Sequence, residues 1–298
     1  MHSASPLYSK GSLTDLEQYL SDREAEVPDL TPGTAAGFVW ADGTPSVTDY
    51  SLVYLHGFSA TRKETWPLSD NIARRLGANL YYPRLTGHGS SGKALAGATA
   101  SAWMRDTIEA IAIGQRIGKK VILVGMSTGA TLAVRYGIEH ENPSIVALVC
   151  ISPNFGLRNR ILPLFASPVA LPFITLLRGN HAGFRPFNPE HQKYWTNRYP
   201  LSALRQLLLT VAATSRHQQP ALSQPVLIVY SPDDHLLAIR NIHRFYRRLK
   251  APAKELFPIT GCDNRESHVI AGTICAPSTT RLIEEATLSF LKKNLSPP

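Results

Sequence analysis

The sequence predicts an α/β protein with a mostly parallel central sheet, helices on both sides and one inserted segment. Two observations lead to this fold class. Short apolar runs without a polar residue alternate with stretches in which apolar residues recur every three to four positions, which is typical of buried parallel strands joined by helices. The alternation stops at Pro153 and resumes at Pro225, so we expect residues 153–224 to form an insertion.

Before the insertion, the expected elements follow one another closely. A polar N-terminal arm, residues 1–35, contains a short helical stretch at Leu13–Leu20 and ends in a run rich in proline and glycine. Apolar runs predict strands at Phe38–Trp40, Ser51–Leu55, Asn79–Tyr82, Val121–Val124 and Ile145–Ile151. Apolar residues at helical spacing predict helices over Leu68–Leu76, from Met104 to near Gly118, and after Ser127.

After the insertion, the alternation continues to the end of the chain. It predicts a strand at Val226–Tyr230, a helix near Ala238–Leu249, a strand at Lys254–Phe257 and a terminal helix near Thr279–Lys293. Residues 36–152 and 225–298 would therefore form one core. The inserted residues contain apolar clusters and prolines but no strand of comparable quality, which favours a small cap, or lid, over the carboxyl edge of the sheet.

The composition fits this fold class and excludes several others. The chain has 298 residues, of which 44% are hydrophobic and 18% charged, so it can bury a core and is not a disordered, collagenous or coiled-coil chain. A net charge of +9 can indicate a nucleic-acid partner, but no nucleic-acid-binding signature is present and none is predicted. The densest basic run, Arg240 to Lys254, has helical spacing and is interpreted as a solvated helix face.

Cysteine usage and the N-terminal residues bear on cofactors and location. No cysteine pair has CxxC spacing and no Cys/His set has zinc spacing, so no metal is predicted. Cys150 ends an apolar run and should be buried, whereas Cys262 and Cys275 flank a loop and could pair in an exported protein. No signal peptide is visible and the apolar stretch 162–177 is broken by prolines, so we expect a soluble protein, cytoplasmic or exported, without a transmembrane segment.

Residues 125–129 form a G-x-S-x-G pentapeptide with Ser127 at its centre. It directly follows the apolar strand Val121–Val124 and precedes a stretch rich in small residues, which is the strand-turn-helix setting of a nucleophile elbow. Gly125 and Gly129 suit a strained turn in which side chains would collide with the neighbouring strand and helix. A glycine-rich turn that merely packs is the alternative, but the flanking sequence favours Ser127 as a nucleophile.

A serine hydroxyl is a weak nucleophile and needs an adjacent histidine that is held by a carboxylate. In a fold of this kind the acid and then the base follow the serine along the chain. The strand after the insertion ends in Asp233 and Asp234; the usual four-residue turn selects Asp234, and Asp233 is the alternative. His268, in the loop after the next strand, is the expected base, because His243 falls within a solvent-facing helix and His235 adjoins the acid too closely.

Attack on a carbonyl creates an oxyanion, which requires two preorganised N–H donors. The backbone amide of Thr128, directly after the serine, is one expected donor. The second should come from the loop after the strand Ser51–Leu55, where the small Gly57 permits close approach and Phe58 would supply its amide. His56 in this loop is expected to pack or hydrogen-bond beneath the site.

Together these segments resemble the α/β-hydrolase superfamily, and most of all its bacterial carboxylesterase and monoacylglycerol lipase branch. The resemblance covers roughly residues 36–295 and includes Leu55-His-Gly-Phe58, Tyr82-Pro-Arg-Leu-Thr-Gly-His-Gly89, the pentapeptide, Tyr230-Ser-Pro-Asp-Asp234 and Ser267-His268. It implies a Ser–His–Asp mechanism through an acyl-enzyme, with no metal or organic cofactor. The sequence departs from the family at Thr128, where many relatives carry an apolar residue, and at Ser231, where glycine is common.

The predicted function is therefore hydrolysis of a small-molecule ester or lipid with an apolar acyl group. The apolar residues of the insertion either pack a lid onto the core or form an acyl pocket, and its arginines are expected to face water: Arg158, Arg160, Arg178 and Arg185. Other acyl-transfer chemistry (peptidase, thioesterase or acyltransferase) and a non-catalytic binding scaffold are alternatives. Transient contact with a membrane surface also stays open, and the sequence does not predict an oligomeric state.

Overall fold

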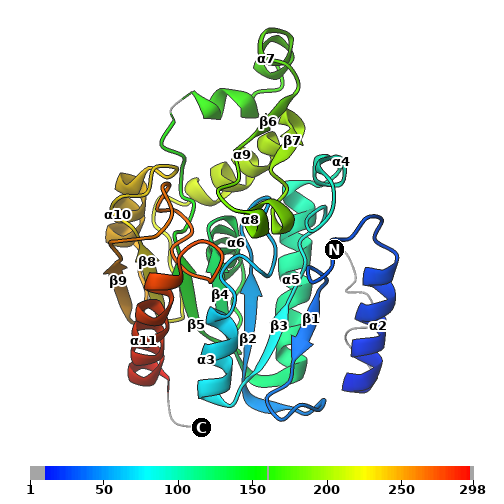
Figure 1. The fold of residues 1–298 in the computed structure, drawn as a ribbon. Helices are drawn as coiled ribbons and strands as arrows, with labels where there is room; N and C mark the ends of the chain where they lie inside the picture. Colours follow the sequence, from blue (N-terminus) through cyan, green and yellow to red (C-terminus); the bar gives the residue numbers. More distant parts are fainter. Residues whose placement is uncertain (1–10, 160, 296–298) are drawn as a thin grey trace.

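A seven-stranded sheet forms the centre of the molecule, in a computed structural model that describes residues 11–159 and 161–295 (Figure 1). Its strand order is β1-β3-β2-β4-β5-β8-β9; β1 is antiparallel to β3 and every other pair is parallel. The mostly parallel α/β architecture predicted from the sequence is thereby confirmed. The strands are β1 (Gly37–Val39), β2 (Thr48–Leu55), β3 (Asn79–Tyr82), β4 (Gly118–Met126), β5 (Ile145–Ile151), β8 (Val226–Tyr230) and β9 (Lys254–Pro258).

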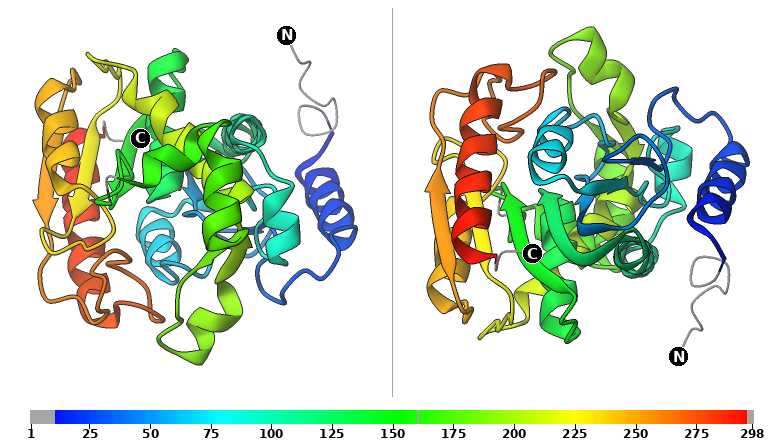
Figure 2. Two further views of the ribbon diagram at one scale, coloured as in Figure 1. Left: turned by 90° about the horizontal axis from the view of Figure 1, so that it is seen from above. Right: turned by 90° about the horizontal axis from the view of Figure 1, so that it is seen from below.

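Helices cover both faces of this sheet, as the views from above and below show (Figure 2). Side chains of β2 alternate between two apolar clusters, with Val53 and Leu55 on one face and Leu52 and Tyr54 on the other. The first face packs against α5 (Ala100–Ile117), α6 (Thr128–Glu139) and α10 (Ile239–Arg248), and the second against α3 (Leu68–Leu76) and α11 (Pro277–Asn294).

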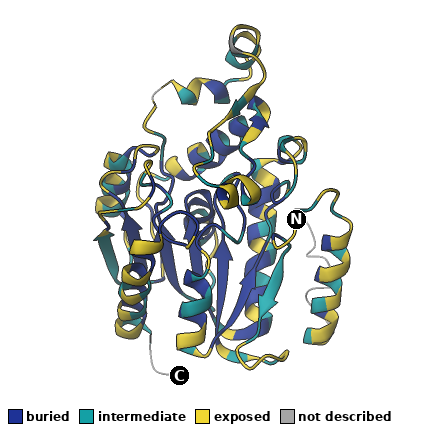
Figure 3. Cartoon of the chain, in the orientation of Figure 1, coloured by how far each residue is buried: buried dark blue, intermediate teal, exposed yellow. Residues whose placement is uncertain are grey.

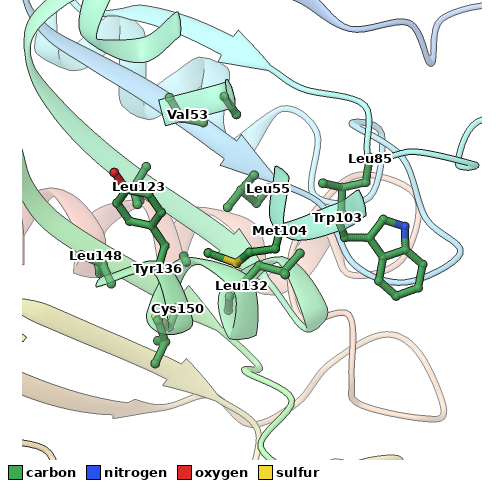
Figure 4. Close-up of a cluster of buried hydrophobic side chains, with 14 of the residues drawn as sticks. Val53, Leu55, Leu85, Trp103, Met104, Leu123, Leu132, Tyr136, Leu148 and Cys150 are labelled. Carbon is green, nitrogen blue, oxygen red and sulfur yellow. The ribbon is translucent and has the colours of Figure 1, made fainter. Parts of the chain in front are cut away.

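The central strands are buried on both faces, which explains why their sequences contain so few polar residues (Figure 3). In the cluster on the first face, side chains of the strands pack against side chains of the helices. Its labelled members include Leu123 of β4, Trp103 and Met104 of α5, and Leu132 of α6 (Figure 4). This packing gives the carboxyl ends of β2, β4 and β8 a fixed position relative to one another.

The N-terminal arm docks on the edge of this core, although residues 1–10 lie outside the described part of the chain. Its helix α2 (Leu13–Ala25) begins in a capping box made by Ser12 and Asp15 and is longer than the helical stretch predicted from the sequence. The additional turn places Glu24 in a buried ion pair with Arg84, at 2.6 Å, which ties the arm to the loop after β3.

Residues 153–224, here called the 153–224 segment, connect β5 to β8 and lie above the carboxyl edge of the sheet (Figure 1). The segment contains η1 (Leu162–Ala166), α7 (Ala170–Arg178), the strands β6 (His181–Gly183) and β7 (Arg198–Pro200), α8 (Pro189–Tyr194) and α9 (Leu201–Ser215), and β7 contacts α4 (Gly92–Ala96) of the core. We predicted no good strand here; the short hairpin of β6 and β7 has three residues per strand, too few for a sequence signal. Several apolar side chains of the segment are exposed: Ile161, Leu164, Val169, Phe173, Leu176 and Leu177.

Three further sequence expectations can be compared with the structure. The thiols of Cys150, Cys262 and Cys275 are all free, so the possible Cys262–Cys275 disulfide is absent; Cys275 instead packs with Ala60 and Trp195. The arginines of α10 are exposed, as expected of a solvated helix face. Within residues 11–159 and 161–295, no helix has the length and apolar character needed to cross a membrane.

Candidate active site

Ser127 occupies a sharp turn between the end of β4 and the start of α6. Its backbone has φ 51° and ψ −112°, a conformation that non-glycine residues rarely adopt. The glycines on either side make this turn possible. A Cβ atom on Gly125 would lie 2.5 Å from the Ala130 nitrogen, and one on Gly129 would lie 1.9 Å from the Leu55 carbonyl oxygen. The predicted strained elbow is therefore present, and it raises the Ser127 hydroxyl at the carboxyl edge of the sheet.

The three side chains expected to form a triad are in hydrogen-bond contact. His268 Nε2 lies 3.0 Å from Ser127 Oγ, and His268 Nδ1 lies 2.7 Å from Asp234 Oδ2. They come from three places in the fold: the turn after β4, the turn after β8 and the loop between β9 and α11. All three residues are buried. The structure thus brings together side chains that are 141 and 34 positions apart in the sequence.

Of the two aspartates after β8, the structure favours Asp234. Its Oδ1 accepts hydrogen bonds from the amides of Leu236 and Leu237, both at 2.8 Å, which leaves Oδ2 directed at the imidazole. Asp233 is exposed, and its amide donates to the Ser231 hydroxyl at 3.2 Å. Because a carboxylate held by two amides has a fixed orientation, Asp234 can fix the ring of His268 in turn.

The pKa of His268 results from opposing effects. Burial lowers it, but the charge and hydrogen bond of Asp234, with smaller contributions from Glu64 and Glu266, outweigh burial and raise the pKa above its ordinary value.

The two alternative histidines have other partners. His235 is exposed and lies 2.9 Å from Arg158, whereas His243 packs half-buried against Tyr230. The expectation that His243 simply faces solvent was therefore wrong, since Tyr230 at the end of β8 provides a partner.

His56 and His88 lie beneath the site and are held neutral. Burial lowers the pKa of His56 to about 4, and burial likewise lowers that of His88. The Leu85 amide donates to His56 Nε2 at 3.1 Å, so Nδ1 carries the proton and donates to the Gly57 carbonyl at 2.9 Å. As expected from the sequence, His56 supports the loop rather than contacting Ser127.

The two amides expected to bind an oxyanion have no partner in the described part of the chain. Thr128 is the first residue of α6, so its N–H precedes the helical hydrogen bonds, and the Phe58 amide likewise donates to no described group. The Phe58 ring is fixed by edge-to-face contacts with Trp103 and with Tyr199 of β7, at centroid distances of 5.9 and 5.0 Å. Both amides are thus available to a ligand.

The 153–224 segment contacts the site at several points. The Asn154 amide donates to the Ser127 carbonyl at 3.2 Å, and the Thr196 amide donates to the Ser59 carbonyl at 2.7 Å. Arg158, whose side chain is exposed as expected, donates its amide to the Leu236 carbonyl at 2.8 Å. Arg185 is also exposed, whereas Arg160 and the side chain of Arg178 lie outside the described part of the structure.

Glu64 is a site-proximal residue that the sequence analysis did not select. It is buried in the loop after β2, and its carboxylate accepts the Gly57 amide at 2.7 Å. No periodicity or motif marks a glutamate in an irregular loop, so only the folded position identifies it. A hydroxyl, an imidazole and a carboxylate therefore meet at one edge of the sheet, and a second carboxylate, that of Glu64, lies in the adjoining loop.

The comparison with known proteins agrees with this geometry. A model described as the alpha/beta hydrolase family matches residues 52–272. The chain belongs to this family. A curated relative of this α/β hydrolase, the thermostable monoacylglycerol lipase of Bacillus sp. (strain H-257), is 24% identical over 209 residues, covering 69% of the chain and 78% of the relative.

Solved structures of the same fold were also found for this α/β hydrolase. One, from a study of the metagenome-derived lipolytic enzymes LipS and LipT, has a TM-score of 0.72 at 22% identity and covers 89% of this chain and 100% of its own. The monoacylglycerol lipase of Paleococcus ferrophilus has a TM-score of 0.66 at 15% identity, with 87% and 98% covered. These likenesses establish the α/β-hydrolase fold.

Proposed function

We propose that this α/β hydrolase cleaves carboxylic esters as a serine hydrolase, with Ser127 as nucleophile, His268 as general base and acid, and Asp234 as the residue that orients His268. The observation that carries the proposal is the continuous line of hydrogen bonds from Asp234 through His268 to Ser127, on a strained turn. The lipases and esterases among its relatives support ester hydrolysis as the reaction.

The chemistry follows from the position of each group. Ser127 Oγ attacks the ester carbonyl carbon as His268 Nε2 takes its proton, and the amides of Phe58 and Thr128 donate hydrogen bonds that stabilise the charge on the carbonyl oxygen. When the tetrahedral intermediate collapses, the carbon–alkoxy bond breaks and His268 gives the proton to the departing alcohol. A water molecule, deprotonated by His268, then attacks the acyl-Ser127 ester, and the acid is released as the proton returns to Ser127.

The substrate we propose has an apolar acyl group, as in a carboxylesterase or a monoacylglycerol lipase. Near the site, the rings of Phe58 and Tyr199 form a contact between the core and the 153–224 segment. We therefore regard this segment as a cap that supplies part of the acyl pocket. Its apolar composition and the name of the Bacillus relative support this choice.

Labelling with a fluorophosphonate probe and a panel of p-nitrophenyl esters of increasing chain length test the proposal. We expect a single adduct on Ser127 and turnover that depends on acyl length. Ser127→Ala should lower kcat by at least about 10⁴-fold with the fold intact, whereas Ser101→Ala, at an exposed position of α5, should be unchanged. An adduct on another residue, or no turnover of any ester by folded wild-type protein, would contradict the proposal.

A further inference from the structure

Glu64 lies in the loop that follows β2 and is only 2% exposed. Its Oε2 accepts two hydrogen bonds, from the Gly57 amide at 2.7 Å and from the Tyr54 hydroxyl at 3.1 Å. Gly57 directly precedes Phe58, the residue whose amide we assign to the oxyanion. The Glu64 carboxylate therefore fixes the backbone of the loop that carries the Phe58 amide, through its hydrogen bond with Gly57.

The same residue also contacts the loop that carries His268. A Cβ atom on Gly57 would lie 2.6 Å from Glu64 Oε1, and one on Gly272, four residues after His268, would lie 2.7 Å from the Glu64 carbonyl oxygen. Both glycines thus allow close approach of their loops to Glu64. Glu64 is packed between the loop that offers the oxyanion amide and the loop that offers the base.

The titratable groups that face Glu64 come from each element packed around it: Tyr54 of β2, His268, and Cys275 before α11. Burial raises the pKa of Glu64 to about 7, against the Gly57 amide, His268 and the Tyr54 hydroxyl, which all lower it. No ion pair joins Glu64 to a lysine or arginine in the described ranges. With this pKa the Glu64 carboxyl is about half ionised at neutral pH, and in its ionised form no lysine or arginine of the described ranges offsets the effect of its charge on His268.

We infer that Glu64 is a positioning residue for the proposed ester hydrolysis, an inference that rests on the function proposed above. Its carboxylate anchors Gly57 and so fixes the Phe58 amide. In its ionised form it also provides a second negative charge, besides that of Asp234, which stabilises the protonated ring of His268 while the tetrahedral intermediate exists. Glu64 thus acts on two groups of the proposed site, the Phe58 amide and the His268 ring, without contacting substrate or Ser127.

The variant Glu64→Gln separates these effects, because the amide oxygen can still accept the Gly57 N–H but carries no charge. We expect kcat to fall about three- to tenfold with KM nearly unchanged. Because the charge of Glu64 raises the pKa of His268, its removal should move the acid limb of the pH profile to lower pH, by about half a pH unit. A purely structural role would reduce stability without moving that limb. Glu255→Gln, on β9, where the carboxylate forms an ion pair with Lys293 at 2.8 Å, is the charge-matched control and should retain the wild-type profile.

A second measurement does not depend on activity. NMR titration of the His268 imidazole, assigned with the His268→Gln variant, should give a lower pKa in Glu64→Gln than in wild type. Tyr54→Phe keeps the carboxylate but removes a hydrogen bond that favours its ionised form, so the influence of Glu64 on His268 should begin at higher pH. If the His268 titration is the same in wild type and Glu64→Gln, the inference is overturned. If the titration shifts but no ester is cleaved by wild type, the coupling stands and the proposed function fails.

Discussion

The carboxyl edge of the sheet and the 153–224 segment above it differ in how their side chains are held. At the edge, Ser127, His268 and Asp234 are buried and hydrogen-bonded to one another or to backbone amides. In the segment, the side chains of Phe173 and Leu176 of α7 are 66% and 83% exposed. From this difference we predict that the proposed reaction depends on a rigid edge, whereas substrate choice depends on a surface that can be altered without disturbing the core.

The largest effect that would test this comparison comes from the elbow. Gly129→Ala places a Cβ atom 1.9 Å from the Leu55 carbonyl oxygen, so backbone must move and we expect a loss of more than about 3 kcal/mol in the free energy of unfolding, or no folded protein. Urea unfolding, monitored by circular dichroism, measures this free energy. Gly97→Ala, where φ is −79° and the nearest atom would be 3.5 Å away, is the control and should change little. Wild-type stability in Gly129→Ala would show that the edge is not rigid.

The next effect concerns the two adjacent aspartates at the same edge. Asp234→Asn removes the charge that raises the pKa of His268 and disturbs the orientation of its ring, so kcat should fall about 10³- to 10⁴-fold. Asp233→Asn is the matched control, because its side chain is exposed, and it should leave kcat within about twofold. Steady-state kinetics with one p-nitrophenyl ester distinguishes them, and equal losses in both variants would rule out the assignment of Asp234.

How far the sequence predicted the molecule differs between the same two regions. The strands Asn79–Tyr82, Ile145–Ile151 and Val226–Tyr230 were predicted with their observed bounds, because runs buried on both faces contain only apolar residues or few others. The side chains proposed as a triad were also selected from sequence, since Ser127 directly follows a strand and Asp234 and His268 lie in the connections after the next two predicted strands beyond the insertion. Their catalytic roles stay a prediction, although the structure brings them into contact.

What the sequence did not predict depends on contacts between distant residues. Glu64 has no local signal, because its partners Gly57 and His268 are defined only by the fold. The exposure of Leu176 could not be predicted from the apolar stretch 162–177 either, since the same stretch is compatible with a buried helix. Local pattern thus predicts strands and turns, while the environment of a residue in a loop or in the 153–224 segment depends on the tertiary structure.

The smallest expected effect belongs to the 153–224 segment. The double variant Leu176→Ser/Leu177→Ser alters side chains that are 83% and 84% exposed, so the free energy of unfolding should stay within about 0.5 kcal/mol of wild type.

If the segment supplies part of the acyl pocket, KM for long-chain p-nitrophenyl esters should rise about two- to fivefold in the double variant, while kcat/KM for the acetate ester stays unchanged, because only a long chain reaches beyond the edge of the sheet. Leu282→Ser, on α11 and 47% exposed, controls for loss of an exposed leucine and should affect neither ester. An equal loss for short and long esters would mean that α7 influences the triad itself, and the division between a rigid reactive edge and an alterable cap would have to be abandoned.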